Sequence, residues 1–123
     1  MKRLLLILCF AILLCSCNSN SNRKYMNEKT IEAYEKALDI LDDVIAKDMD
    51  AQVAERKLKS LSESIEGSDD TFQSLASSEI KLLGVNISSM SLHNKLDSGD
   101  GTLYTSDIKV LKEKRKEIAD KIK

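Results

Sequence analysis

Apolar residues recur at alternating steps of three and four along most of the chain from residue 24 onward, which is the spacing of helices that bury one face. Short polar or glycine-containing stretches interrupt this rhythm and divide it into four segments. We expect helices at about residues 24–47, 51–66, 71–96 and 105–122. The pattern therefore predicts an all-α fold, a small three- or four-helix bundle that occupies residues 24–123.

The first predicted helix has one apolar seam and one acidic face. The seam consists of Ile31, Tyr34, Leu38, Leu41 and Ile45, widened by Ala37, Ile40 and Val44. The opposite face carries Glu32, Glu35, Asp39, Asp42 and Asp43. We interpret the acidic face as solvated rather than as a cation site, because neighbouring carboxylates on one helix do not enclose an ion.

Two arrangements are open around residues 48–50: one continuous helix, or two helices separated by a break. At about 100° per residue, the second seam, formed by Leu58, Leu61 and Ile65, lies about half a turn from the seam of the first helix. One straight helix would then bury opposite faces at its two ends. The phase favours a break, with Asp50 capping the second helix.

The third predicted helix has clear boundaries and two apolar stripes. Gly67 suits the end of the preceding helix, and Asp70 with Gln73 has the spacing of a capping box. One stripe consists of Phe72, Ala76, Ile80, Leu83, Ile87 and Met90, and the other of Leu82, Val85, Leu92 and Leu96. Two stripes predict burial against more than one neighbour, so we expect this helix to be the central one.

Small residues gather within this helix at Gly84, Ser88, Ser89 and Ser91. They favour a close approach of a neighbouring helix or a mild kink. The functional alternative is a hinge or a groove for a partner.

The stretch at 97–101 contains aspartates and glycines, but it lacks the alternating ligands and closing glutamate of a calcium loop, so we interpret it as a flexible connection.

The last helix repeats the three-four spacing at Ile108, Leu111, Ile118 and Ile122. From residue 106 it carries seven basic and four acidic residues, whereas residues 23–50 carry five and eight. Opposite charge predicts that the two helices lie side by side. The alternative is that the basic helix contacts anionic membrane or wall polymer.

The chain begins with a basic Met1-Lys2-Arg3, followed by an eleven-residue apolar run at 4–14 and then by Cys15-Ser16-Cys17. The run is too short to cross a bilayer, and its parts are those of a secretory signal. Leu14 and Ser16 before Cys17 resemble the lipobox of bacterial lipoproteins. The resemblance covers residues 1–17 only. It implies cleavage before Cys17, lipidation of that cysteine and anchorage through its acyl chains.

On this interpretation residues 1–16 are a signal peptide and residues 17–23 are the lipidated cysteine with an Asn/Ser-rich tether. The location would be the cell envelope, at the outer membrane or the outer face of the cytoplasmic membrane, depending on the host. All three cysteines, at positions 9, 15 and 17, belong to the leader or its cleavage site. We therefore expect no disulfide in the bundle.

The sequence favours no catalytic, cofactor or metal site, and we do not expect the protein to be an enzyme. His93 is the only histidine. It leaves little from which to build a nucleophile-base pair or a metal site. Removal of residues 1–16 leaves 17 basic and 20 acidic residues, which argues against nucleic acid as a partner.

Two functions follow as hypotheses. The first is a lipid-anchored, non-catalytic module that binds another protein, including one of the exclusion or immunity type. The second is a small helical carrier of a lipid or another apolar ligand, although few aromatic residues are present to line a pocket.

Overall fold

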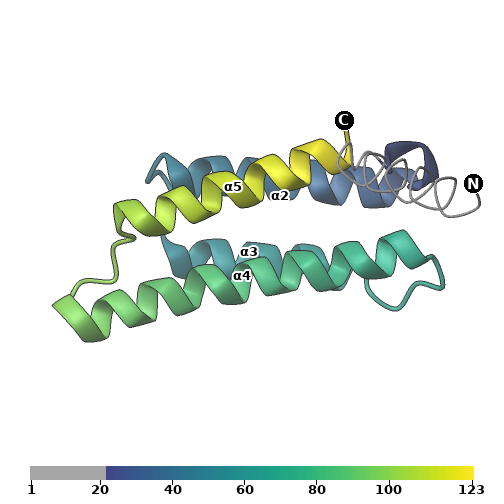
Figure 1. Ribbon diagram of the computed structural model, residues 1–123. Helices are drawn as coiled ribbons and strands as arrows, with labels where there is room; N and C mark the ends of the chain where they lie inside the picture. Colours follow the sequence, from purple (N-terminus) through teal and green to yellow (C-terminus); the bar gives the residue numbers. More distant parts are fainter. Residues whose placement is uncertain (1–21) are drawn as a thin grey trace, which may run out of the picture.

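The structure is a computed structural model that describes residues 22–123, and these residues form an all-helical bundle (Figure 1). A short 3₁₀ turn, η1, precedes four α-helices. The elements are η1 (Arg23–Tyr25), α2 (Glu28–Ile45), α3 (Ala51–Ser64), α4 (Thr71–Ser98) and α5 (Thr105–Lys121). The predicted all-α fold is confirmed, in its four-helix form.

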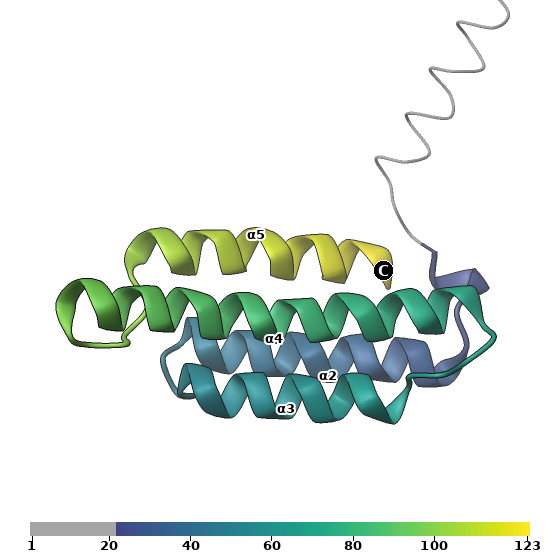
Figure 2. The same ribbon diagram turned by 90° about the horizontal axis from the view of Figure 1, so that it is seen from below.

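The helices lie in two layers, with α2 and α5 forming one and α3 and α4 the other (Figures 1 and 2). Between them is a single core of apolar side chains from all four helices. Its largest fully buried members are Tyr34, Leu41, Leu58, Ile80, Ile87 and Leu111. The longest helix, α4, packs mainly against α3, and α5 packs mainly against α2.

The chain breaks between α2 and α3, as the phase of the two seams predicts. Lys47 adopts a left-handed conformation with φ 62°, which a helix cannot continue through. The side chain of Asp50 then accepts a hydrogen bond from the backbone N–H of Gln52 at 2.7 Å and caps α3. Leu58 and Ile65 are buried, so both seams face the core.

The start of α4 confirms only half of the predicted capping box. The Asp70 side chain accepts a hydrogen bond from the N–H of Gln73 at 2.9 Å. The Gln73 side chain does not reach back. It donates to the carbonyl of Ile65 at 3.0 Å and accepts from Asn27 at 2.8 Å. Because Gln73 is buried, these bonds satisfy an amide that would otherwise be costly to enclose.

Gly84 marks the close approach of α3 and α4 that its size predicts. A Cβ atom on Gly84 would lie 3.2 Å from Cβ of Leu58 and 3.4 Å from the carbonyl oxygen of Glu55. A larger side chain here would separate the two helices. The glycine therefore sets the spacing of this layer.

The prediction that the first and last helices are neighbours is also confirmed. Arg115 on α5 forms an ion pair with Asp42 on α2, and its Nη2 donates to Oδ2 of Asp42 at 3.1 Å. Leu111 and Ile118, four positions before and three after Arg115, are buried beneath it. The pair therefore closes the outer edge of the α2–α5 contact.

Two predicted boundaries are wrong at the beginning of the bundle. The first α-helix begins at Glu28 and not near residue 24, because Asn27 caps it by accepting from the N–H of Thr30. The tether was expected to continue through Arg23. Instead the Asn22 N–H donates to the carbonyl of Lys121 at 3.0 Å, and the Arg23 guanidinium donates to that of Ile122 at 2.8 Å. The two ends of the described chain therefore meet at one end of the bundle (Figure 1).

The connection from α4 to α5 is held more firmly than the expected flexible loop. The helix α4 extends to Ser98, and Gly99 ends it in the left-handed conformation with φ 80°. Buried Asn94 donates from its amide to the carbonyl of Thr102 at 2.9 Å and to Asp107 at 2.8 Å. Ser91 donates to the carbonyl of Gly101 at 2.8 Å. These bonds fix the turn into α5.

Candidate functional site

The outward face of α4 carries a continuous line of apolar and small residues. We call it the α4 seam and define it as Leu75, Ser78, Leu82, Val85, Ser89, Leu92 and Leu96, all of them exposed. The residues recur at alternating steps of three and four over about six helical turns. Such spacing keeps side chains on one face and is typical of a helix that packs against another helix.

This face lies opposite the core. The core face of α4 contains Ala76, Ile80, Leu83 and Ile87, all buried. Ile80 and Leu82 are about 200° apart around the helix, so the two apolar stripes point in nearly opposite directions. The expectation that both stripes are buried within the bundle is wrong. The other three helices cover one side of α4 and leave the second stripe without an internal neighbour.

The exposure of the seam is large for leucine and valine side chains. Leu82 is 59 % exposed, Leu96 81 % and Val85 45 %. The seam extends over about 32 Å of helix at 1.5 Å per residue, and its seven members carry no charge. Single exposed leucines are ordinary, whereas exposed apolar side chains lined up along one helix face are typical of a protein or membrane contact.

The sequence contained most of this signal. The predicted stripe contains Leu82, Val85, Leu92 and Leu96 and lacks Leu75. It also lacks the two serines at 78 and 89. The unbroken three-four spacing from residue 75 to residue 96 is the signal that joins them.

The two edges of the seam carry different polar side chains. One edge carries exposed Lys81 and Lys95, and the other carries Glu79, Asn86 and His93. Glu79 is held in place from two sides. Nζ of Lys121 on α5 lies 2.6 Å from its Oε1, and the hydroxyl of Tyr34 on α2 donates to its Oε2 at 3.1 Å.

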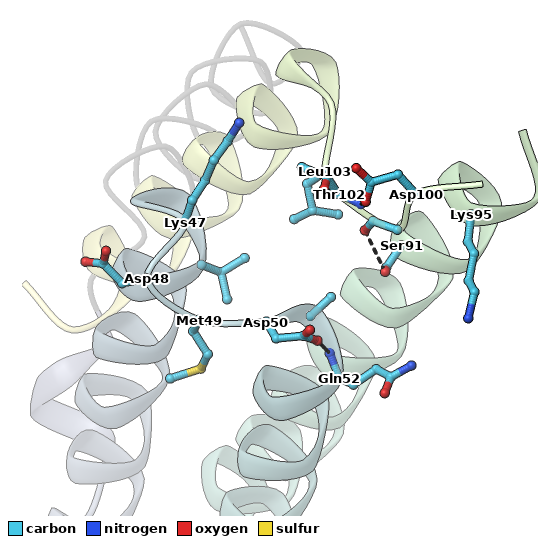
Figure 3. A pocket seen from close by; sticks show the side chains of 13 residues that line it. Lys47, Asp48, Met49, Asp50, Gln52, Ser91, Lys95, Asp100, Thr102 and Leu103 are labelled. Atoms are coloured by element: carbon cyan, nitrogen blue, oxygen red, sulfur yellow. Dashed lines mark hydrogen bonds between the residues drawn. The ribbon is translucent and has the colours of Figure 1, made fainter. Parts of the chain in front are cut away.

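A polar cleft of about 480 Å³ lies between the α2–α3 and α4–α5 connections (Figure 3). Lys47, Asp48 and Asp50 approach it from one connection, and Asp100 and Thr102 from the other. Its carboxylates are already engaged in part. Asp50 caps α3, and hydrogen bonds from the hydroxyl and the N–H of Thr102 hold the pKa of Asp100 below its usual value. The cleft combines both signs of charge without a converging set of catalytic groups.

A second hollow of about 240 Å³ lies between α4 and α5. Leu82, Leu83 and Ile118 form its apolar side, and Lys114, Glu117 and Lys121 lie at its rim. Because Leu82 belongs to both, the hollow continues the α4 seam toward α5. It widens the apolar surface that a docking partner could cover.

Within residues 22–123 no group of three or more His, Cys, Asp or Glu side chains is placed to hold a metal ion. His93 lies exposed on α4. None of the helices in this range is both long and apolar enough to cross a bilayer. Cys17, the predicted lipidation site, lies outside the described residues.

Comparison with known proteins identifies no relative. No protein-family model matches the chain, and neither the curated proteins nor the solved structures contain a significant match.

Proposed function

We propose that this protein is a lipid-anchored cell-envelope lipoprotein whose bundle acts as a non-catalytic protein-docking module, with the α4 seam as the docking face. The observation that carries the proposal is the exposure of Leu82, Val85 and Leu92 on the side of α4 away from the core. An exposed apolar helix face is disfavoured in water unless something covers it. A partner helix that packs along the seam would remove these side chains from water, at the entropic cost of ordering the two surfaces.

The anchor rests on the lipobox-like Leu14-Cys15-Ser16-Cys17. Two acyl chains on Cys17 would give stable attachment, because each buried methylene contributes about 0.8 kcal/mol. The bundle begins at residue 22, only a few residues later. A tether of this length would hold the end of the bundle where α4 begins close to the lipid surface.

The distribution of apolar surface favours docking over a carrier function. A carrier encloses its ligand in a chamber lined mainly by apolar side chains. The hollow between α4 and α5 is small and has charged residues at its rim, and the larger cleft is polar. The exposed apolar side chains lie instead on an open helix face, which suits a macromolecular partner.

The docking role is tested by two matched substitutions in the full chain. Val85 in the seam and Val110 on α5 are 45 % and 41 % exposed, so glutamate at either position leaves the core intact. After extraction from membranes in mild detergent, we expect the wild type and Val110→Glu to migrate as a complex larger than the monomer. Val85→Glu should migrate as the monomer, since docking would bury an unpaired carboxylate. A monomeric wild type, or equal behaviour of the two variants, would overturn the docking role.

A further inference from the structure

We propose that the bundle contacts the lipid headgroups through a small patch at the end where the chain enters it. We call this the entry patch and define it as Arg23, Lys24, Tyr25 and Phe72. The inference rests on the proposed function, because it requires the acyl anchor on Cys17, but it does not depend on what covers the α4 seam. Its support comes from the way the fold fixes the patch, from the chemistry of its side chains and from the short chain that leads to the anchor.

The entry patch is fixed to the bundle. Nη1 of Arg23 donates to the carbonyl of Ile122 at 2.8 Å, just after the end of α5. Tyr25 stacks on Phe72 in the first turn of α4, with ring centroids 6.2 Å apart and an interplanar angle of 10°. The turn η1 is therefore held against both helices at one end of the bundle (Figure 2). A segment that is already ordered loses little further conformational entropy when it meets a surface.

The side chains of the patch are those of a membrane boundary. Tyr25 is 59 % exposed despite its contact with Phe72, and Nζ of Lys24 lies 4.9 Å from the centre of its ring. Tyrosine is enriched where lipid chains meet water, because its ring is apolar and its hydroxyl is polar. The patch therefore offers an aromatic ring to the lipid and two neighbouring cations to its phosphate groups.

The charges nearest the anchor also suit a lipid surface. The only charged residues in the sequence from 17 to 27 are Arg23 and Lys24, and the first acidic residue after them is Glu28. Both cations are exposed. A basic residue close to an anionic lipid surface contributes about 1 kcal/mol to binding. The two cations would thus add to the hold of the acyl chains.

The chain between the patch and the anchor is short. An extended chain covers at most about 18 Å from Cys17 to Asn22, and a flexible chain of that length covers about 12 Å on average. The helix α4 alone is about 42 Å long. The anchor therefore keeps the entry patch close to the lipid, whereas the opposite end of the bundle can lie far from it.

Acidic residues at the same end determine which corner makes the contact. Glu66 and Asp69 are exposed in the connection from α3 to α4, which also lies at the end where the chain enters (Figure 2). Anionic headgroups repel these carboxylates. We therefore expect the corner with η1 to approach the lipid and the acidic corner to stay in water. Most of the α4 seam then extends away from the membrane, where a protein partner can reach it.

Fluorescence quenching by brominated lipid tests the contact in the full, acylated chain. The sequence contains no tryptophan, so Tyr25→Trp places a single fluorophore in the patch. Tyr104→Trp is the matched control, because Tyr104 is also exposed, at 38 %, and precedes α5 at the opposite end of the bundle (Figure 1). Each variant is purified from bacterial membranes and reconstituted into vesicles of equal parts phosphatidylglycerol and brominated phosphatidylcholine. Tyr25→Trp should lose most of its emission and shift to shorter wavelength, whereas Tyr104→Trp should keep its emission.

A second pair of variants tests the cations. Lys24→Glu added to Tyr25→Trp should restore part of the emission, because the new carboxylate is repelled by phosphatidylglycerol. Lys59→Glu, at an exposed position of α3, makes the same charge change outside the patch and should leave the quenching as it was.

Three results would overturn the inference. The first is equal quenching of Tyr25→Trp and Tyr104→Trp. The second is an unquenched Tyr25→Trp in acylated chain that floats with the vesicles. The third is an equal effect of Lys24→Glu and Lys59→Glu. The proposed function fails separately, when the purified chain carries no acyl mass or when the extracted wild type is monomeric.

Discussion

The hydroxyl of Tyr34 donates a hydrogen bond to Oε2 of Glu79 at 3.1 Å, and this contact joins α2 to α4 across the bundle. The carboxylate also accepts from Lys121, so three helices meet at Glu79. Tyr34 is almost fully buried. Burial, together with the negative charge of Glu79 and the hydrogen bond to it, raises the pKa of Tyr34 well above its usual value.

The raised pKa of Tyr34 predicts an alkaline loss of stability. An unfolded tyrosine ionises near pH 10, whereas folded Tyr34 keeps its proton at that pH. The contribution of Tyr34 is thus complete below about pH 10 and is lost as the pH rises above it, because only the unfolded state releases the proton. Urea unfolding of the wild type and Tyr34→Phe at about pH 8 and about pH 11 measures this. The wild type should lose more stability than the variant between the two values. An equal loss would contradict the assignment.

Removal of the cap at Asp50 should destabilise the bundle. Its side chain accepts the hydrogen bond from the N–H of Gln52 at the start of α3. We expect Asp50→Ala to lower the free energy of unfolding by about 1 kcal/mol. Asp48→Ala is the control, since Asp48 is exposed and lies outside α3. If the two variants unfold at the same urea concentration, the cap does not contribute as the geometry implies.

Asn94 should be the most sensitive polar residue of α4. It is buried, and its amide donates to the carbonyl of Thr102 and to the carboxylate of Asp107. We expect Asn94→Ala to cost about 2 kcal/mol, because both acceptors lose their donor. Asn86→Ala, at an exposed position of the same helix, should change stability by less than about 0.5 kcal/mol. Thermal unfolding followed by circular dichroism compares them, and a similar midpoint for both would count against the role given to Asn94.

Enlarging Gly84 should separate α3 from α4. A Cβ atom added at Gly84 would lie 3.2 Å from Cβ of Leu58 and 3.4 Å from the carbonyl oxygen of Glu55. We expect Gly84→Leu to lower the free energy of unfolding by about 1–3 kcal/mol through overpacking. Ser74→Leu, exposed on the same helix, is the control and should have little effect. A fully stable Gly84→Leu would show that the two helices can move apart at no cost.

Features that depend on residues close together in the sequence were predicted correctly. Asp50 and Asp70 cap the helices they were expected to cap, because a carboxylate that accepts from the second or third N–H of a helix is a local interaction. The size of Gly84 indicated a close helix approach for the same reason: the constraint is visible in one residue. Periodicity likewise predicted the buried faces of α3 and α5.

The failures concern what each residue meets in three dimensions. Periodicity revealed two apolar stripes on α4 but could not say that the bundle covers only one of them. The side chain of Gln73 was expected to complete a local box, and it found the distant Asn27 and the carbonyl of Ile65 instead. The bonds of Asn22 and Arg23 to the end of α5 join residues about a hundred positions apart. Such contacts depend on the assembled fold.

The orientation of the docking face depends on the lipid anchor, and intact mass tests that anchor most directly. The full chain and a Cys17→Ala variant would be expressed in bacteria, fractionated and weighed by mass spectrometry. We predict that the wild type sediments with the membrane as a chain that begins at Cys17 and carries acyl mass, whereas Cys17→Ala stays unprocessed and unacylated. A soluble wild type without acyl mass would contradict the lipid anchor.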